Sequence, residues 1–276
     1  MGRLICSGIA DEGANSLEDQ VQMHQLLGWK HLEVRNINGT TIDTLDDEDF
    51  ARSVETLRRS GMGVSCLASD IGKLWLDGPK YQPFSQDLES LPSLLERAQA
   101  LDCKFIRVMA YHRQNLSDRE WREQGIARLR KLAALAEKAE VYLGLENCCG
   151  WHSYNGRRMV DVLESVGSEY LVALYDTGNT GRDGADAWEY YTTVKPFIRY
   201  VHIKDWAGEG KGYTLPGQGL SSVTRILQDL QESDYAGFVS IEPHMAGSAH
   251  LPHLEGDPWS VYKEYGETLN KLLGKS

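Results

Sequence analysis

Carboxylate and imidazole side chains follow several apolar runs of this 276-residue chain, at positions where they can bind a metal ion. Four of them stand at or near the ends of four successive runs and are Glu146, Asp176, His202 and Glu242. Their separations of 30, 26 and 40 residues each correspond to one strand-and-helix repeat. Three carboxylates and one imidazole form an oxygen-rich set that suits Mn²⁺ or Mg²⁺ and also accepts Zn²⁺ or Co²⁺. The spacing predicts one divalent metal site, with Mn²⁺ as the favoured ion.

Each of these four positions has an ordinary structural alternative. An acidic residue at the end of a strand is commonly a helix N-cap or a solvated loop residue, and a single histidine is more often a hydrogen-bonded core residue than a ligand. The combination favours the metal site, because carboxylates buried together must be neutralised. Asp11, Glu12 and Arg35, at the ends of the first two runs, are expected to form an ion pair instead.

The elements that would position these side chains alternate regularly. Eight short runs rich in Val, Ile and Leu recur, and each is followed by a longer segment with helical spacing. Near-continuous apolar runs are typical of parallel strands that are buried on both faces. The predicted strands are Leu4–Ile9, His31–Arg35, Gly63–Ala68, Phe105–Met109, Val141–Glu146, Leu171–Asp176, Tyr200–Lys204 and Phe238–Glu242.

Eight strand-helix units predict a closed (β/α)₈ TIM barrel, in which the carboxyl ends of the strands converge at one mouth. No Pro/Ser-rich or low-complexity stretch divides the sequence, so a single domain over residues 1–276 is expected. The alternative is a doubly wound open sheet, which usually has a glycine fingerprint after its first strand; here that run leads into Ala10-Asp11-Glu12-Gly13. One helix is predicted to begin at Ser117, because Ser117-Asp-Arg-Glu120 has the spacing of a capping box.

The composition excludes several classes of protein. Lys and Arg total 29 against 40 Asp and Glu, so the net charge is −11, and the basic surface of a nucleic-acid-binding protein is not expected. No apolar run approaches the roughly 18 residues of a membrane span, and the N-terminus becomes acidic too early for a signal peptide. Five scattered cysteines are more typical of a reducing compartment than of a disulfide framework. We expect a cytoplasmic protein that binds neither nucleic acid nor membranes.

Five short motifs extend this pattern along predicted strands two, five, six, seven and eight. They are His31-Leu-Glu-Val-Arg35, Gly144-Leu-Glu146-Asn147, Asp176-Thr-Gly-Asn179, Val201-His202-Ile-Lys-Asp205 and Ser240-Ile-Glu242. With these motifs the chain resembles the sugar phosphate isomerase/epimerase superfamily, the xylose isomerase-like TIM barrels that include the ketose 3-epimerases. The resemblance spans nearly the whole chain. It implies a divalent metal held by Glu146, Asp176, His202 and Glu242.

The resemblance also implies an activity, namely that of a metal-dependent isomerase or epimerase of a sugar or sugar derivative. In that chemistry a metal ion polarises a carbonyl group and lowers the barrier to removing the adjacent C–H proton. Glu146 and Glu242 are implied to double as acid and base, removing the proton from one face of the sugar and returning it on the other through an enediolate. The implied partner is a small carbohydrate, and the habit of the family is to form a homo-oligomer.

Positions around the implied metal depart from the ketose 3-epimerase pattern. Asn179 stands where that branch has a histidine, Gly208 where it has an arginine, and His152 where it has a second glutamate. His152 and Asn179 are expected in loops above the metal, as substrate-binding residues or as solvated loop residues. Lys204 shares a strand face with His202, so it is expected to point into the barrel as a substrate contact or as part of a structural ion pair.

Three other functions are compatible with the same fold. An apurinic-site endonuclease would need further histidines after strands three and four, where the sequence has Leu67-Ala68-Ser69 and Val108-Met109-Ala110, and its acidic charge opposes binding of a phosphate backbone. A lyase such as an inosose dehydratase uses the same metal but expels water, and is the closer alternative. A non-catalytic sugar-binding barrel is the third, and the intact pair of Glu146 and Glu242 argues against it.

Overall fold

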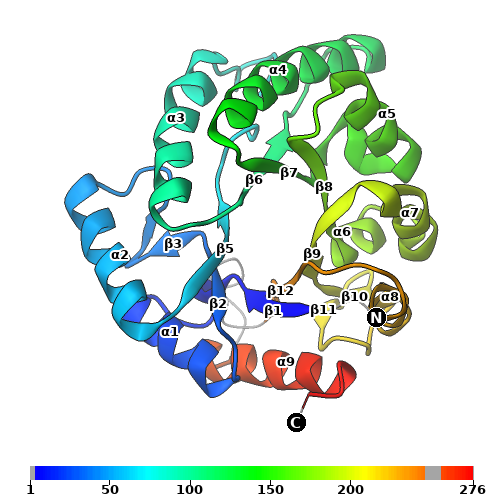
Figure 1. The fold of residues 1–276 in the computed structure, drawn as a ribbon. Coiled ribbons are helices and arrows are strands. Elements are labelled where there is room, and N and C mark those ends of the chain that lie inside the picture. The colour runs from blue at the N-terminus through cyan, green and yellow to red at the C-terminus, as the bar shows by residue number, and fades with distance from the viewer. Residues whose placement is uncertain (1–3, 246–255, 276) are drawn as a thin grey trace.

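Eight parallel strands form the centre of the computed structural model, which describes residues 4–245 and 256–275 (Figure 1). They pair in the order β1-β12-β9-β8-β7-β6-β5-β2, and a parallel bridge between Ile9 and Glu33 links the two outermost strands. The strands are β1 (Ile5–Gly8), β2 (His31–Val34), β5 (Gly63–Ala68), β6 (Phe105–Ala110), β7 (Tyr142–Gly150), β8 (Leu171–Asp176), β9 (Ile198–Ile203) and β12 (Phe238–Ile241).

Helices surround the strands as an outer ring (Figure 1). They are α1 (Leu17–Leu26), α2 (Asp47–Ser60), α3 (Ser85–Ala100), α4 (Asp118–Ala139), α5 (Gly156–Val166), α6 (Thr177–Arg182), α7 (Ala187–Val194), α8 (Val223–Glu232) and α9 (Pro258–Leu272). Short 3-10 helices cover Ala10–Glu12, Trp151–Tyr154 and Lys195–Phe197. Among the described residues, no helix has the length and apolar character that crossing a membrane requires.

The predicted (β/α)₈ barrel is confirmed, and its strands lie where the apolar runs are. Gly63–Ala68 and Leu171–Asp176 have the predicted bounds. All six residues of the second of these strands are buried, because one face lies in the barrel interior and the other under the helices. The strand Tyr142–Gly150 runs four residues beyond the predicted end, where the β6–β7 register shifts.

Two antiparallel hairpins follow barrel strands at their carboxyl ends. One pairs β3 (Asn36–Ile37) with β4 (Thr40–Thr41), and the other pairs β10 (Asp205–Gly208) with β11 (Gly212–Thr214). The carboxylate of Asp205 accepts hydrogen bonds from the main-chain N–H groups of Gly217, Gly219 and Ser221 at 2.8, 3.0 and 3.0 Å. The segment after the second hairpin is therefore tied back to the end of β9.

Helix α4 begins with the predicted capping box. The Glu120 N–H donates to Ser117 Oγ at 3.3 Å, and the Ser117 N–H donates to Glu120 Oε2 at 2.8 Å. We expect Ser117→Ala to lower the free energy of unfolding by about 1 kcal/mol, because the Glu120 N–H at the helix terminus loses its acceptor. Urea denaturation monitored by circular dichroism measures the change. Gln124→Ala, at an exposed position of the same helix, is the control, and equal losses in the two variants would contradict a capping role.

Candidate active site

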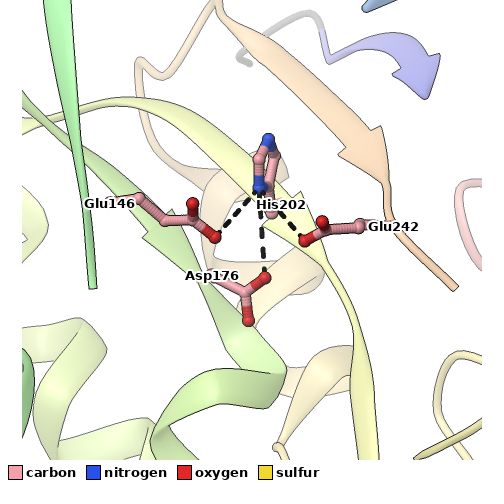
Figure 2. A group of neighbouring side chains, drawn as sticks. All are labelled: Glu146, Asp176, His202 and Glu242. Atoms are coloured by element: carbon pink, nitrogen blue, oxygen red, sulfur yellow. Dashed lines mark ion pairs between the residues drawn. The ribbon is translucent and has the colours of Figure 1, made fainter. Parts of the chain in front are cut away.

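The four residues with metal-ligand spacing lie together at the carboxyl ends of the strands (Figure 2). Glu146 lies in β7, Asp176 ends β8, His202 lies in β9, and Glu242 directly follows β12. One potential ligand atom from each lies within 4.8 Å of the others. All four side chains are buried, with at most 3% exposed. We call these four residues the carboxylate–histidine cluster.

Strand register explains why these side chains meet. Asp176 stands directly beside His202 in the β8–β9 pairing, and His202 stands beside Ser240 in the β9–β12 pairing. Glu242 lies two residues beyond Ser240, so its side chain is on the same side of the strand direction, one step further toward the mouth. Its N–H donates to the carbonyl oxygen of Ile203 at 3.1 Å, which extends the ladder past the end of β12.

The cluster has the spacing of a cation site. His202 Nδ1 lies 3.5 Å from Glu146 Oε1, 3.7 Å from Glu242 Oε2 and 3.9 Å from Asp176 Oδ2. Ligands at roughly 2.1 Å from one metal ion lie about 3.0–4.2 Å apart, depending on the angle between them. One buried atom of each residue also forms no hydrogen bond among the described residues, namely Glu146 Oε2, Asp176 Oδ2, His202 Nδ1 and Glu242 Oε2; the three oxygens lie instead in ion-pair contact with Lys204 or Arg107. Distances and donor types therefore fit a divalent cation.

Two cationic side chains lie against these carboxylates. Lys204 Nζ is 2.7 Å from Glu242 Oε2 and 3.2 Å from Asp176 Oδ2, and Arg107 Nη1 is 3.6 Å from Glu146 Oε2. Lys204 is only 1% exposed, which confirms that it points into the barrel, and it forms an ion pair there. Such cations are required, because a buried carboxylate without a counter-charge is strongly destabilising.

The neighbouring charges decide the protonation of the two glutamates. Burial raises the pKa of Glu146, but the Arg107 guanidinium and the His202 ring together outweigh burial, and the pKa falls to about 2. At Glu242, burial likewise raises the pKa and the neighbouring Lys204 ammonium lowers it. The pKa of this carboxyl group lies well below its usual value. Both glutamates are therefore carboxylates at neutral pH, the form that can accept a proton.

A second group of charges adjoins Glu242. Arg35 Nε lies 3.1 Å from Asp11 Oδ2, and its Nη2 lies 3.5 Å from Glu12 Oε1, which confirms the predicted ion pair. Arg35 Nη1 is also 3.2 Å from Glu242 Oε1. His244 Nε2 lies 3.2 Å from both Glu12 Oε1 and Glu242 Oε1. Glu242 thus directs Oε2 toward the carboxylate–histidine cluster while Arg35 and His244 contact Oε1.

Asn179 contacts the cluster directly. Its Nδ2 donates to Glu146 Oε1 at 3.2 Å, and its Oδ1 accepts from Lys204 Nζ at 3.5 Å. The expectation that Asn179 lies in a loop is wrong, because it lies in helix α6. That helix starts at the end of β8, where Asp176 Oδ1 accepts the Asn179 N–H at 2.7 Å and so acts as the N-cap.

His152 contacts the backbone of the cluster rather than its side chains. It is fully buried, and its Nε2 lies 2.7 Å from the main-chain oxygen of Glu146. It also lies in a short helix, Trp151–Tyr154, and not in the expected loop. Its role in substrate binding stays a prediction.

Three residues that contact the cluster had no role in the sequence analysis. Glu33 and Arg107 are charged residues within the apolar runs of β2 and β6, and a charge inside a strand buried on both faces must have a partner; this pattern could have identified them. Asn147 is the third. Its side chain donates to the main-chain oxygen of Asp176 at 2.9 Å and accepts the Asp176 N–H at 2.6 Å. Asn147 stands in the motif Gly144-Leu-Glu146-Asn147, but it had no role of its own in the sequence analysis.

Two solved structures with the same fold are described by a bound metal and by a sugar substrate. The IolI protein with a bound zinc atom superposes with a TM-score of 0.78 at 15% identity, covering 99% of this chain and 98% of IolI. The D-allulose 3-epimerase from Methylomonas sp., in complex with D-allulose, superposes with a TM-score of 0.75 at 16% identity, covering 100% of this chain and 98% of the epimerase. At these identities the likeness establishes the fold.

Sequence comparison gives weaker matches to curated proteins and a broad match to a family. The inosose dehydratase of Bacillus velezensis is 26% identical over 147 residues, covering 46% of this chain and 48% of that protein. The chain thus spans about half the length of the first curated relatives it matches. The family model for xylose isomerase-like TIM barrels matches residues 23–260. With that match and eight parallel strands around one mouth, the chain belongs to the xylose isomerase-like TIM barrel family.

Proposed function

We propose that this chain is a divalent-metal-dependent isomerase or epimerase that acts on a sugar or sugar derivative. The observation that supports this most is the convergence of one imidazole and three buried carboxylates, each with one oxygen 3.5–3.9 Å from His202 Nδ1. Glu146, Asp176, His202 and Glu242 would hold the metal. Mn²⁺ is the favoured ion because the set is rich in oxygen, with Mg²⁺, Co²⁺ or Zn²⁺ as alternatives.

The reaction needs removal of a weakly acidic proton beside a carbonyl group. When bound, a divalent ion supplies stabilisation of the negative charge that develops on the carbonyl oxygen. Figure 2 shows Glu146 and Glu242 on opposite sides of the His202 ring. One of these carboxylates would take the proton from one face of the substrate. The other would take a proton from solvent water and deliver it to the opposite face of the enediolate, while the first would release its proton to solvent.

Three neighbours of the cluster would bind substrate. Lys204 and Asn179 reach the cluster with an ammonium group and an amide group, which can donate hydrogen bonds to sugar oxygens. Lys204 also lies beside both Glu242 and Asp176, so it can stabilise negative charge near the reacting carbon. His152 is the third candidate; its ring is fully buried, and its Nε2 contacts the main-chain oxygen of Glu146.

The experiment that tests this function combines metal analysis with a substrate panel. Protein purified without chelators should contain about one divalent ion per chain, because residues 4–245 and 256–275 bring together one set of four ligands. A panel of ketoses and inososes, followed by NMR, should yield an isomer or epimer that carries solvent deuterium when the reaction runs in deuterated water. Binding of three zinc ions, or of none, would contradict the proposal.

The panel includes inososes because inosose dehydratases are among the curated relatives. If an inosose loses water while every ketose is unchanged, the same metal and glutamates serve a lyase instead. That outcome would retain the proposed site and replace the proposed reaction.

A further inference from the structure

The carboxylate of Glu33 lies directly behind the metal-facing histidine. Glu33 is in β2 and is fully buried. His202 Nε2 lies 3.0 Å from Glu33 Oε2 and 3.1 Å from Glu33 Oε1, so this ring nitrogen faces both carboxylate oxygens. The other ring nitrogen, Nδ1, points to the three carboxylates of the cluster (Figure 2). The histidine is therefore held between Glu33 on one side and the proposed metal on the other.

Two hydroxyl groups hold Glu33 in place. Tyr200 donates its O–H to Glu33 Oε2 at 2.8 Å, and Ser240 donates its O–H to the same oxygen at 2.6 Å. Tyr200 also contacts Ser65 Oγ at 2.9 Å, which anchors the phenol in the barrel interior. The Glu33 carboxylate thus accepts from both hydroxyl groups, and an ionised carboxylate has no proton to donate.

This arrangement determines which ring nitrogen of His202 carries a proton. A carboxylate cannot donate to Nε2, so the contact is favourable only when Nε2 is protonated. In the neutral imidazole the lone pair then lies on Nδ1, the nitrogen that faces Glu146 and Glu242. The reverse tautomer would place a lone pair against a buried carboxylate and a proton toward the metal site.

We propose that Glu33 is the positioning residue of this site: through its bond to Nε2 it selects the His202 tautomer and ring orientation that direct the Nδ1 lone pair at the cation. The proposal rests on the proposed function, since it presumes a cation at the carboxylate–histidine cluster. It assigns a role to a residue 169 positions away from His202 in the sequence.

Glu33→Gln tests the proposal because glutamine keeps the shape of the side chain. An amide can present either its oxygen or its NH₂ group to Nε2, so it no longer selects one tautomer. We expect the dissociation constant for Mn²⁺ to rise about 10–100-fold, the usual effect of losing a partner that orients a ligand. Isothermal titration calorimetry on protein stripped of metal measures this constant. A constant unchanged within twofold would overturn the proposal.

A spectroscopic measurement on the native chain gives an independent test. In the zinc-loaded protein, the ¹⁵N spectrum of His202 should show a protonated Nε2 and a zinc-bound Nδ1, with the signals assigned by their loss in His202→Gln. A zinc-bound Nε2 would overturn the proposal even if Glu33→Gln does not fold.

Two controls separate a positioning role from general damage. Ser53→Ala removes a buried hydroxyl of helix α2, which donates to the main-chain oxygen of Asp49 at 2.7 Å and contacts neither Glu33 nor the cluster, and Mn²⁺ affinity should stay within twofold of the native value. If Glu33→Gln lowers the melting temperature while Mn²⁺ affinity is unchanged, Glu33 is structural only. If the native chain binds no Mn²⁺, the proposed function fails first, and the tautomer of metal-free His202 still reports on the Glu33 contact.

Discussion

Glu146→Gln and Glu242→Gln should each lower turnover of a confirmed substrate by at least about 10²–10⁴-fold. That range is the usual contribution of general acid–base catalysis, and weakened metal binding adds to the loss. Glutamine retains an oxygen that can contact a cation but cannot accept and deliver a proton. Steady-state kinetics at saturating Mn²⁺ measures the effect. One of the two variants keeps the glutamate that removes the substrate's proton. In deuterated water, substrate recovered from that variant should still carry deuterium in place of this hydrogen.

A buried acid elsewhere provides the matched control. Asp87 is 3% exposed and accepts hydrogen bonds from the Tyr111 hydroxyl and the Gly72 N–H, outside the cluster. Asp87→Asn should therefore leave turnover per folded molecule within about twofold, although it removes a buried charge. If both glutamine variants keep native turnover, the acid–base assignment is wrong. Proton transfer would then have to fall to another residue, with Lys204 and His152 as the nearest candidates.

The second large effect is expected from His202→Gln. Glutamine can keep a hydrogen bond to Glu33 but lacks a ligand atom in the position of Nδ1, so a ligand is removed while the buried carboxylate keeps a donor. We expect Mn²⁺ affinity to fall by at least about 100-fold, more than loss of an orienting partner alone would cause. Metal analysis after dialysis, and the rise in melting temperature on adding Mn²⁺, measure the change. Native protein at 100 times its dissociation constant should gain about 2.7 kcal/mol, and the variant little.

His24 offers a control for the loss of a buried histidine. Its ring nitrogens contact the carbonyl oxygen of His31 and the hydroxyl of Tyr262 at 2.7 and 2.9 Å, and it is fully buried. His24→Gln should lower stability in the absence of metal but leave the stabilisation by Mn²⁺ intact. Equal stabilisation of His202→Gln and native protein by Mn²⁺ would show that the cation binds elsewhere.

The sequence alone was sufficient for the architecture of the barrel and for the membership of the cluster. Strands buried on both faces have near-continuous apolar runs, so each strand can be read locally, and Leu171–Asp176 has the predicted bounds. A polar residue at the end of such a run must lie at the barrel mouth. Asp176, His202 and Glu242 could therefore be grouped from position alone, and the Asp11–Arg35 pair follows from the same reasoning.

The tertiary structure decided which groups surround the cluster. Glu33 reaches His202 across the barrel interior, and Arg107 reaches Glu146 from the neighbouring strand. These contacts depend on how far each strand is shifted against its neighbours and on which side chains point inward together, and no local pattern encodes that shift. Asn179 shows the same limit: a capping bond from Asp176 starts a helix where a loop was expected. The local sequence determines which side chains stand at the carboxyl end of each strand, whereas closure of the barrel determines which of those side chains touch.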